Sequence, residues 1–226
     1  KDDETIRNKA KDLHKNIIWY SLKTSADIYF ENILLKQDHT ECVLVVAGER
    51  HDVRIPVISY GQLGSVLAAC AVAHAMNVPV KNIAEQLAAL PVLKKTMEYK
   101  ILSNKAIIVD DSYSASEASV MNAIEYLKSV GDETSLLVLV PIIELGNESS
   151  IVHEKIGTTL AHVPFKTFIY GTAYQEDIMR GLAQASHAHI TWYTDAKVLA
   201  SDVAKHSAPN TITVFEGRLP GIVTAL

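Results

Sequence analysis

The 226-residue sequence is poor in the features that mark several protein classes, with only two cysteines and two tryptophans. Cys42 and Cys70 lie far apart in the sequence and do not have the spacing of metal ligands. This pattern favours free thiols that pack as small apolar side chains in a reducing compartment, with a disulfide between them as the alternative. The longest apolar stretch, Val66–Met76, contains His74 and is too short to span a bilayer. The amino-terminal segment is charged throughout, unlike a signal peptide. The sequence therefore predicts a cytoplasmic protein with no membrane partner.

Strong positive charge is also absent. The formal net charge is −5, and the most basic local patch is the pair Lys94 and Lys95. Because nucleic-acid binding needs a basic surface, the composition predicts no nucleic-acid partner. The hydrophobic fraction of 48% and the charged fraction of 21% are typical of a globular protein with a sizeable core.

Phosphate-binding loops of the common kinds are missing too. No G-x-x-x-x-G-K-[ST] motif occurs, and no G-x-G-x-x-G opens a helix after a strand, which disfavours a dinucleotide-dependent oxidoreductase. The nearest candidate is Gly61-Gln-Leu-Gly64 at an expected helix start, where N–H groups could receive an anion. Tight packing is the alternative role for these glycines. No Ser–His–Asp triad is supported either, because the G-x-S-x-G elbow is absent.

The hydrophobic pattern changes near residues 91–98, which divides the chain into an expected domain at 1–94 and a second at 95–226. The first domain begins with a short helix over 4–14, and closely spaced strands then predict an antiparallel or mixed sheet. Its remaining expected elements are strands at Ile17–Tyr20, Asp27–Leu35, Cys42–Ala47 and Val53–Val57 and helices at Gly61–Met76 and Val80–Ala89. In the second domain strands alternate with helices, which predicts an α/β, doubly wound and mostly parallel sheet. Its expected strands are Tyr99–Leu102, Lys105–Val109, Ser135–Val140, Lys166–Tyr170, His189–Tyr193 and Thr211–Phe215, and its helices are Glu117–Ser129, Ser149–His162, Gln175–Ala185 and Asp195–His206.

A polar turn follows the buried strand that ends near Val109. It begins with Asp110 and Asp111 and runs through Tyr113 to a helix pattern. Open α/β sheets bind ligands at the carboxyl ends of their strands, so this turn is well placed for a polar small molecule. The alternative is that Asp111 or Ser112 merely caps the helix while Tyr113 packs beside it.

A second polar turn follows the next strand and contains Glu144, Gly146 and, in the first turns of the helix, His153. Gly146 suits a positive φ angle and Ser149 suits a helix N-cap. Glu144 fits a ligand contact or a hydrogen bond within the loop, whereas a hydrogen bond to the preceding loop is favoured for His153. Since three carboxylates are expected on one edge of the sheet, a divalent-cation site there is a further alternative. The remaining histidines form no metal-binding motif; they are His14, His39, His51, His74, His162, His187, His189 and His206.

Together the two turns resemble the carboxy-terminal domain of the Mur ligases, the ATP-dependent amide-forming enzymes of peptidoglycan synthesis. The type that adds D-alanyl-D-alanine to a UDP-N-acetylmuramoyl-tripeptide is the most similar. Its DDSYNANP motif is matched by the segment from Asp110 to Glu117, and its ELG turn and following helix by Glu144-Leu-Gly146, His153 and Gly157. Upstream, Asp2-Asp3 resembles the end of the NADD element and Leu67-Ala-Ala69 the NALAA helix.

The sequence departs from the family at several positions. Gly61 and Ser65 replace a histidine and an asparagine, and an expected arginine falls near Thr96, where Lys94 and Lys95 supply cations. Other departures are Ser114 and Ser116 for two asparagines, Glu117 for a proline, and Glu216-Gly217-Arg218 for the KGS element. The resemblance also places the P-loop and the lysine that becomes carbamylated before residue 1.

The resemblance implies a chain made of the end of the Mur central domain followed by the Rossmann-like carboxy-terminal domain. That second domain would close over ATP and the incoming amine, with a nucleotide-linked peptidoglycan precursor and an amino acid or dipeptide as substrates. The candidate nucleotide residues are Asp110, Asp111, Tyr113, Ser114 and Ser116, and the candidate substrate-side residues are Glu144, His153, Lys94 and Lys95. ATP and Mg²⁺ belong to the intact family enzyme, so we expect these 226 residues alone neither to bind them tightly nor to catalyse ligation. The alternative is a degenerate, non-catalytic Mur-like binding or scaffolding module.

Overall fold

The computed structural model describes residues 1–11, 13, 15–183 and 189–225 and divides the chain into two compact units, Lys1–Val92 and Leu93–Leu226. The expected division after residue 94 lies two residues from this boundary. The expected ends of the helices over 4–14 and Gln175–Ala185, together with His14 and His187, involve positions outside the described residues. None of the helices among the described residues has the length and apolarity needed to cross a bilayer.

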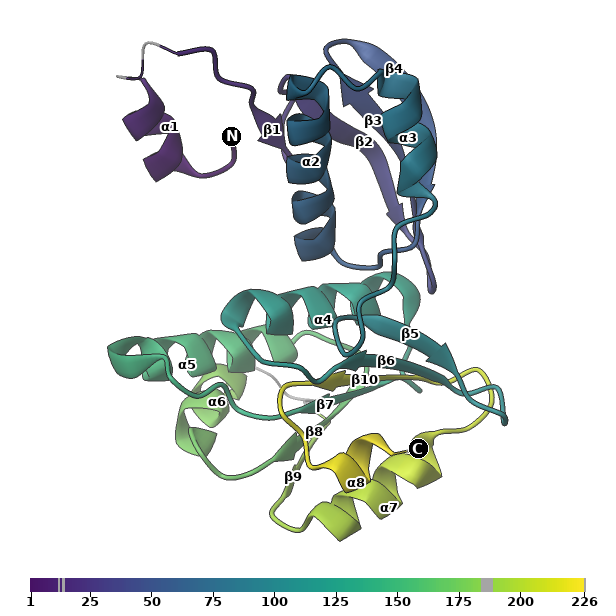
Figure 1. Ribbon diagram of the computed structural model, residues 1–226. Helices are drawn as coiled ribbons and strands as arrows, with labels where there is room; N and C mark the ends of the chain where they lie inside the picture. Colours follow the sequence, from purple (N-terminus) through teal and green to yellow (C-terminus); the bar gives the residue numbers. More distant parts are fainter. Residues whose placement is uncertain (12, 14, 184–188, 226) are drawn as a thin grey trace. The chain divides into compact units, whose positions relative to one another are not determined.

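The first unit contains a mixed four-stranded sheet in the order β1-β2-β3-β4 (Figure 1). Only the β1–β2 pairing is parallel; β2 with β3 and β3 with β4 are antiparallel. The elements are α1 (Glu4–Ala10), β1 (Tyr20–Ser21), β2 (Ile28–Leu35), β3 (Thr40–Val46), β4 (Glu49–Ile55), α2 (Tyr60–Ala75) and α3 (Val80–Leu87). The mixed sheet expected from the sequence is therefore confirmed.

Local geometry explains two differences from the expected strands. Of the strand expected at Ile17–Tyr20, only Tyr20 lies in β1, which ends at Ser21; beside it the Asp2 carboxylate accepts hydrogen bonds from Ser21 and Leu22. β4 begins four residues early because Ala47 and Gly48, with φ angles of 50° and 89°, make a tight hairpin after β3.

Leucine, isoleucine and cysteine side chains form the core between this sheet and α2 and α3. Cys42 and Cys70 are free and buried in that core, so no disulfide joins them. Burial raises the pKa of the Cys42 thiol to about 12 and that of Cys70 to about 11, which makes both unreactive apolar groups. The start of α2 is capped by Ser59. A Cβ added to Gly64 would lie 3.5 Å from Leu22, an ordinary van der Waals distance, so packing does not require a glycine there.

The second unit is a six-stranded sheet in the order β5-β6-β10-β7-β8-β9. Only β5 is antiparallel to its neighbour; the other pairings are parallel. The strands are β5 (Glu98–Ile101), β6 (Ile107–Asp111), β7 (Leu136–Leu139), β8 (Lys166–Tyr170), β9 (Ile190–Tyr193) and β10 (Ile212–Glu216). The mostly parallel, doubly wound sheet expected from the sequence is confirmed.

Helices cover both faces of this sheet (Figure 1). On one face lie α4 (Glu117–Val130) and α5 (Ser149–Leu160), with α6 (Gln175–Leu182) packed on α5; on the other lie α7 (Ala196–His206) and the short α8 (Gly221–Thr224). Successive side chains of a strand point to opposite faces, so Ile108, Val138 and Phe215 join Leu199 and Val203 in the core beneath α7. The carboxyl ends of β6, β10, β7 and β8 consequently meet at one edge, which is where both polar turns lie.

Candidate functional site

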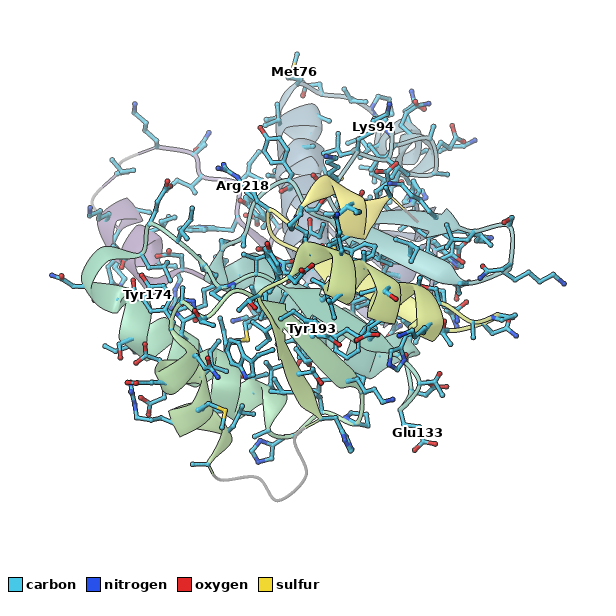
Figure 2. The ribbon with its side chains drawn as sticks, turned by 90° about the horizontal axis from the view of Figure 1, so that it is seen from below. Met76, Lys94, Glu133, Tyr174, Tyr193 and Arg218 are labelled. Atoms are coloured by element: carbon cyan, nitrogen blue, oxygen red, sulfur yellow. The ribbon has the colours of Figure 1, made fainter. Side chains whose placement is uncertain are left out.

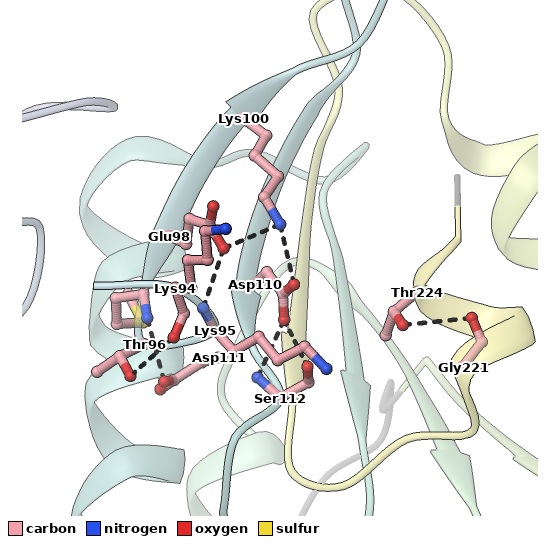
Figure 3. Close-up of polar contacts among 11 residues, drawn as sticks. Lys94, Lys95, Thr96, Glu98, Lys100, Asp110, Asp111, Ser112, Gly221 and Thr224 are labelled. Carbon is pink, nitrogen blue, oxygen red and sulfur yellow. Dashed lines mark hydrogen bonds and ion pairs between the residues drawn. The ribbon is translucent and has the colours of Figure 1, made fainter. Parts of the chain in front are cut away.

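The first polar turn is built around Asp110, the fourth residue of β6. Its carboxylate accepts hydrogen bonds from the Ser112 N–H at 3.1 Å and the Ser112 hydroxyl at 2.6 Å, and it forms an ion pair with Lys100 at 3.0 Å (Figure 3). Burial alone would raise the pKa of Asp110, but the hydrogen bonds from Ser112 and Lys100 outweigh it and lower the pKa. Asp110 is thus an ionised side chain that shapes the turn from within.

Asp111, the last residue of β6, is also buried and faces a different set of groups. Its carboxylate accepts the Met97 N–H at 3.1 Å and lies within hydrogen-bonding distance of the Glu216 carboxyl at the end of β10. Burial and the nearby charge of Asp110 raise the pKa of Asp111, while the hydrogen bonds from Glu216 and Met97 oppose the change.

The alternative in which Asp111 or Ser112 caps the next helix is wrong. Ser116 is the N-cap of α4: its hydroxyl accepts the Ser119 N–H at 3.1 Å, and the Ser119 hydroxyl accepts the Ser116 N–H at 2.8 Å. Tyr113 does not pack beside the helix either, since 71% of it is exposed. Ser114 is exposed as well, so the turn presents an aromatic ring and a hydroxyl outward.

The two lysines of the preceding segment are held against this turn. The Lys95 carbonyl accepts the Tyr113 N–H at 3.1 Å. The Lys95 N–H donates to Glu98 at 2.9 Å (Figure 3). Lys95 and Met97 have positive φ angles of 57° and 47°, a sharp bend that these hydrogen bonds hold in place. Lys94 and Lys95 are exposed, and the hydrogen bond between the main chains of Lys95 and Tyr113 ties their segment to the turn.

The second turn follows β7 and is organised by His153. The imidazole is fully buried; its Nε2 accepts the Ile142 N–H at 3.0 Å, and its Nδ1 lies 2.7 Å from the Ser149 carbonyl, to which it donates. The hydrogen bond to the preceding loop that the sequence favoured is therefore present. Because both ring nitrogens are engaged, His153 acts on this site by holding the loop.

The loop held by His153 presents Glu144 to solvent. Glu144 has a φ angle of 68° and Gly146 one of 56°, so two left-handed residues turn the chain between β7 and α5. Gly146 thus takes the conformation expected of it. Ser149 is not the N-cap, which is a correction: a 3₁₀ turn over Gly146–Glu148 runs directly into α5, and the Ser149 hydroxyl donates back to the Gly146 carbonyl at 2.8 Å.

Tyr174 is a contact of His153 that the sequence did not indicate. The two rings stack with centroids 4.2 Å apart and an interplanar angle of 13°. Tyr174, whose side chain is labelled in Figure 2, precedes α6 and has a φ angle of 55°. Together with residues of the same loop and of α6, it lines a cavity of about 600 Å³. The other lining residues are Thr172, Gln175, Glu176, Asp177 and Met179. A separate cavity of about 480 Å³, lined by Lys166, Phe168 and His206 among others, lies away from both turns at the amino ends of β8 and β9.

The open possibility of a cation site made of three carboxylates is not supported by the geometry. Within residues 1–11, 13, 15–183 and 189–225, no group of three or more His, Cys, Asp or Glu side chains is arranged to hold a metal ion. Asp110 is instead paired with Lys100, and Asp111 with Glu216. Lys100 and Ser119 carried no signal in the sequence, and Glu216 was visible only as a departure from a motif.

Comparison with known proteins indicates the same family as the motifs. No protein-family model matches the chain. The UDP-N-acetylmuramoyl-tripeptide–D-alanyl-D-alanine ligase of Buchnera aphidicola subsp. Baizongia pistaciae is 28% identical over 148 residues, which cover 66% of this chain and 32% of the relative. The ligase of the same name from Bacillus subtilis is 22% identical over 199 residues, 87% of this chain and 43% of the relative.

Solved structures share the fold. The MurF ligase from Thermotoga maritima in complex with ADP superposes with a TM-score of 0.82 at 20% identity, covering 99% of this chain and 51% of that one. MurF from Acinetobacter baumannii gives a TM-score of 0.81 at 18% identity, with coverages of 98% and 47%. The chain thus spans about a third to a half of the length of these relatives.

The fold and the two turns at its carboxyl edge define a Mur-ligase-like α/β chain, and the resemblance to the Mur ligase family predicted from the motifs is confirmed. Within that family, the type indicated by the motifs, the D-alanyl-D-alanine-adding ligase, is the type to which the two curated relatives described above belong.

Proposed function

We propose that this chain is the part of a Mur-type ATP-dependent amide ligase that meets the nucleotide and the incoming amine. The observation that carries the proposal is the placement of the Asp110–Ser116 turn and the Glu144 loop on one carboxyl edge of a parallel sheet. Curated relatives named as ligases of peptidoglycan precursors support it. The substrates would be a nucleotide-linked muramoyl peptide and an amino acid or dipeptide, and the reaction would take place in the cytoplasm.

The residues of the first turn fit a nucleotide in part. The exposed Tyr113 ring offers a stacking surface for a base, and the Lys94 and Lys95 ammonium groups offer charge to phosphates. Asp110 and Asp111 are committed to internal partners, so their role is to hold the turn in shape. Ser116 has the same role through its cap of α4, while Ser114 remains available as a hydrogen-bonding hydroxyl.

When bound, ATP would supply the phosphoryl group that activates a carboxylate for attack by an amine, with magnesium neutralising phosphate charge. The described residues include no P-loop for this purpose, in keeping with the sequence. Glu144 would lie on the amine side, where an exposed carboxylate can attract an ammonium group. His153 would serve that side by fixing the loop through Ile142 and Ser149.

The competing function is a non-catalytic Mur-like binding or scaffolding module. The replacement of a family lysine by the buried Glu216 is the observation that favours it. The discriminating experiment is an assay of ATP-dependent amide formation by the protein that carries this chain, using the muramoyl tripeptide and D-alanyl-D-alanine. Wild-type turnover that falls at least tenfold in Tyr113→Ala supports the ligase, with Tyr20→Ala as the matched exposed-tyrosine control in the first unit. If the wild type neither releases phosphate nor forms the amide product, the ligase proposal is contradicted and the non-catalytic module is favoured.

The 226 residues by themselves provide a second test of the same proposal. We expect no ATP hydrolysis and no ligation from them, because no P-loop is present to position the phosphates. ATP-dependent ligation by the isolated chain would contradict this expectation.

A further inference from the structure

Glu216, the last residue of β10, is a fully buried carboxyl group that the proposed function does not use. Parallel pairing of β10 with β6 places its Cα directly opposite that of Asp111. On the other side of β10, the Val140 N–H donates to the Glu216 carbonyl, which fixes the main chain. Two carboxyl groups therefore lie side by side at the base of the Asp110–Ser116 turn.

The hydrogen bonds around Glu216 leave one oxygen unsatisfied if the group is ionised. Its Oε1 accepts the Ser119 hydroxyl at 2.7 Å, whereas Oε2 has no donor among the described residues. The Asp111 carboxyl lies within hydrogen-bonding distance, but two carboxylates cannot bond to each other without a proton. A proton on one of the pair turns the repulsion into a hydrogen bond and satisfies both groups.

The charged groups near the pair decide which carboxyl holds that proton. Asp111 accepts the Met97 N–H, which favours its ionised form, whereas the Glu216 carboxyl accepts the Ser119 hydroxyl on Oε1 and has no donor among the described residues on Oε2. Asp110 is the other carboxylate beside Asp111, and it is neutralised by Lys100 of β5, which Glu98 also contacts. From α4, the Ser119 hydroxyl contacts the pair by donating to Glu216. Burial and the charge of Asp111 raise the pKa of Glu216 strongly, which places the proton on Glu216.

Both neighbours of Glu216 belong to the framework of the candidate nucleotide turn. Ser119 forms the reciprocal cap with Ser116 at the end of the turn, and Asp111 at its beginning holds Met97 and thereby the segment with the two lysines. We propose that Glu216 is a positioning residue of this turn: as a carboxylic acid it donates to Asp111 and accepts from Ser119, so one buried side chain fixes both ends. The link to nucleotide binding rests on the proposed function, whereas the shared proton does not.

The first experiment compares the pH dependence of unfolding in wild type, Glu216→Gln and the control Glu125→Gln on the exposed face of α4. An unfolded glutamate loses its proton near pH 4.5, while the folded Glu216 keeps it to much higher pH. Above pH 4.5, deprotonation of this group in the unfolded chain should therefore raise the equilibrium constant for unfolding of the wild type about tenfold per pH unit. Glutamine retains a donor and an acceptor but cannot titrate, so Glu216→Gln should lose this tenfold dependence between pH 5.5 and 7.5. Identical slopes for wild type and Glu216→Gln would overturn the shared proton.

The second experiment records amide NMR shifts on addition of millimolar ADP and magnesium. We expect Tyr113 and Ser116 to shift in wild type and Glu216→Gln but not in Glu216→Met, which keeps the size and loses both hydrogen bonds. Shifts retained in Glu216→Met would overturn the positioning role. Absence of shifts in the wild type would instead count against the proposed nucleotide site, while the pH slopes still decide the shared proton. Should Glu216→Met not fold, Ser119→Ala removes the hydrogen bond to Glu216 together with one half of the cap of α4, and it is read against Ser116→Ala, which disturbs the same cap and leaves Glu216 its donor. Shifts lost in Ser119→Ala and retained in Ser116→Ala support the positioning role, whereas shifts lost equally in both would overturn it.

Discussion

The contact between α5 and α6 offers the most direct test of how the second turn is held, because it depends on two glycines. A Cβ added to Gly157 would lie 2.1 Å from the Ile178 carbonyl oxygen and 2.9 Å from its carbon. A Cβ added to Gly181 would lie 2.1 Å from the Glu154 carbonyl oxygen. Both obstacles are backbone atoms, so Gly157→Ala must push the helices apart. We therefore expect a loss of stability in the second unit.

The magnitude follows from two opposing effects. Overpacking against backbone costs about 3 kcal/mol, the upper end of the usual range. Alanine is favoured over glycine within a helix by about 1 kcal/mol, which leaves a net loss of about 2 kcal/mol. With a urea m value of about 2 kcal/mol per molar, the unfolding midpoint should fall by about 1 M.

Urea unfolding followed by circular dichroism measures this shift, and Gly221→Ala in α8 is the matched control. A Cβ at Gly221 meets nothing within 4 Å, so its midpoint should stay within about 0.3 M of wild type. Because Tyr174 precedes α6 and stacks on His153, Gly157→Ala should also speed hydrogen exchange at the loop before α5. A wild-type midpoint for Gly157→Ala would refute the close helix crossing.

Three further substitutions test individual contacts of the two turns. His153→Phe leaves the buried Ile142 N–H without its acceptor, so the free energy of unfolding should fall by about 1–3 kcal/mol. Hydrogen exchange at the Ile142 amide, measured by mass spectrometry, should accelerate; an unchanged exchange rate would contradict the hydrogen bond. Lys100→Met removes the partner of Asp110, whose lowered pKa contributes stability that is present above pH 3.8 and lost as the pH falls through the folded pKa. Because the Lys100 side chain is 41% exposed, the free energy of unfolding at pH 7 should fall by about 1 kcal/mol or less. Carbon NMR should show a higher pKa for Asp110 in the variant than in wild type, and an unchanged pKa would argue against the ion pair. Ser116→Ala removes the N-cap of α4 and should lower thermal stability by about 1 kcal/mol, whereas Ser114→Ala, the exposed control, should not; equal effects would contradict the assigned cap.

The order of elements could be predicted from the sequence because each depends on local periodicity. Alternating strand and helix patterns after residue 98 are sufficient to indicate a parallel sheet, and the glycine at 146 indicates a positive φ. The placement of Asp110 at the carboxyl end of its strand follows from the same pattern. These features need no information about distant parts of the chain.

Contacts between distant segments could not be predicted in this way. Asp111, Ser112 and Ser116 are all suitable capping residues, and only the geometry of the turn selects Ser116. The pairing of Glu216 with Asp111 depends on the register of two strands that are far apart in the sequence. Tyr174 stacks on His153 in a left-handed conformation for which a tyrosine carries no signal.

An NMR titration of the chain with ATP and magnesium, followed amide by amide, shows whether the Asp110–Ser116 turn binds a nucleotide. We expect weak, saturable shifts concentrated on the amides of residues 94–95 and 110–116, with the amides of α2 and α3 unchanged. Shifts absent from these residues at millimolar nucleotide, or confined to the distant cavity lined by Lys166 and Phe168, would contradict a nucleotide role for the Asp110–Ser116 turn.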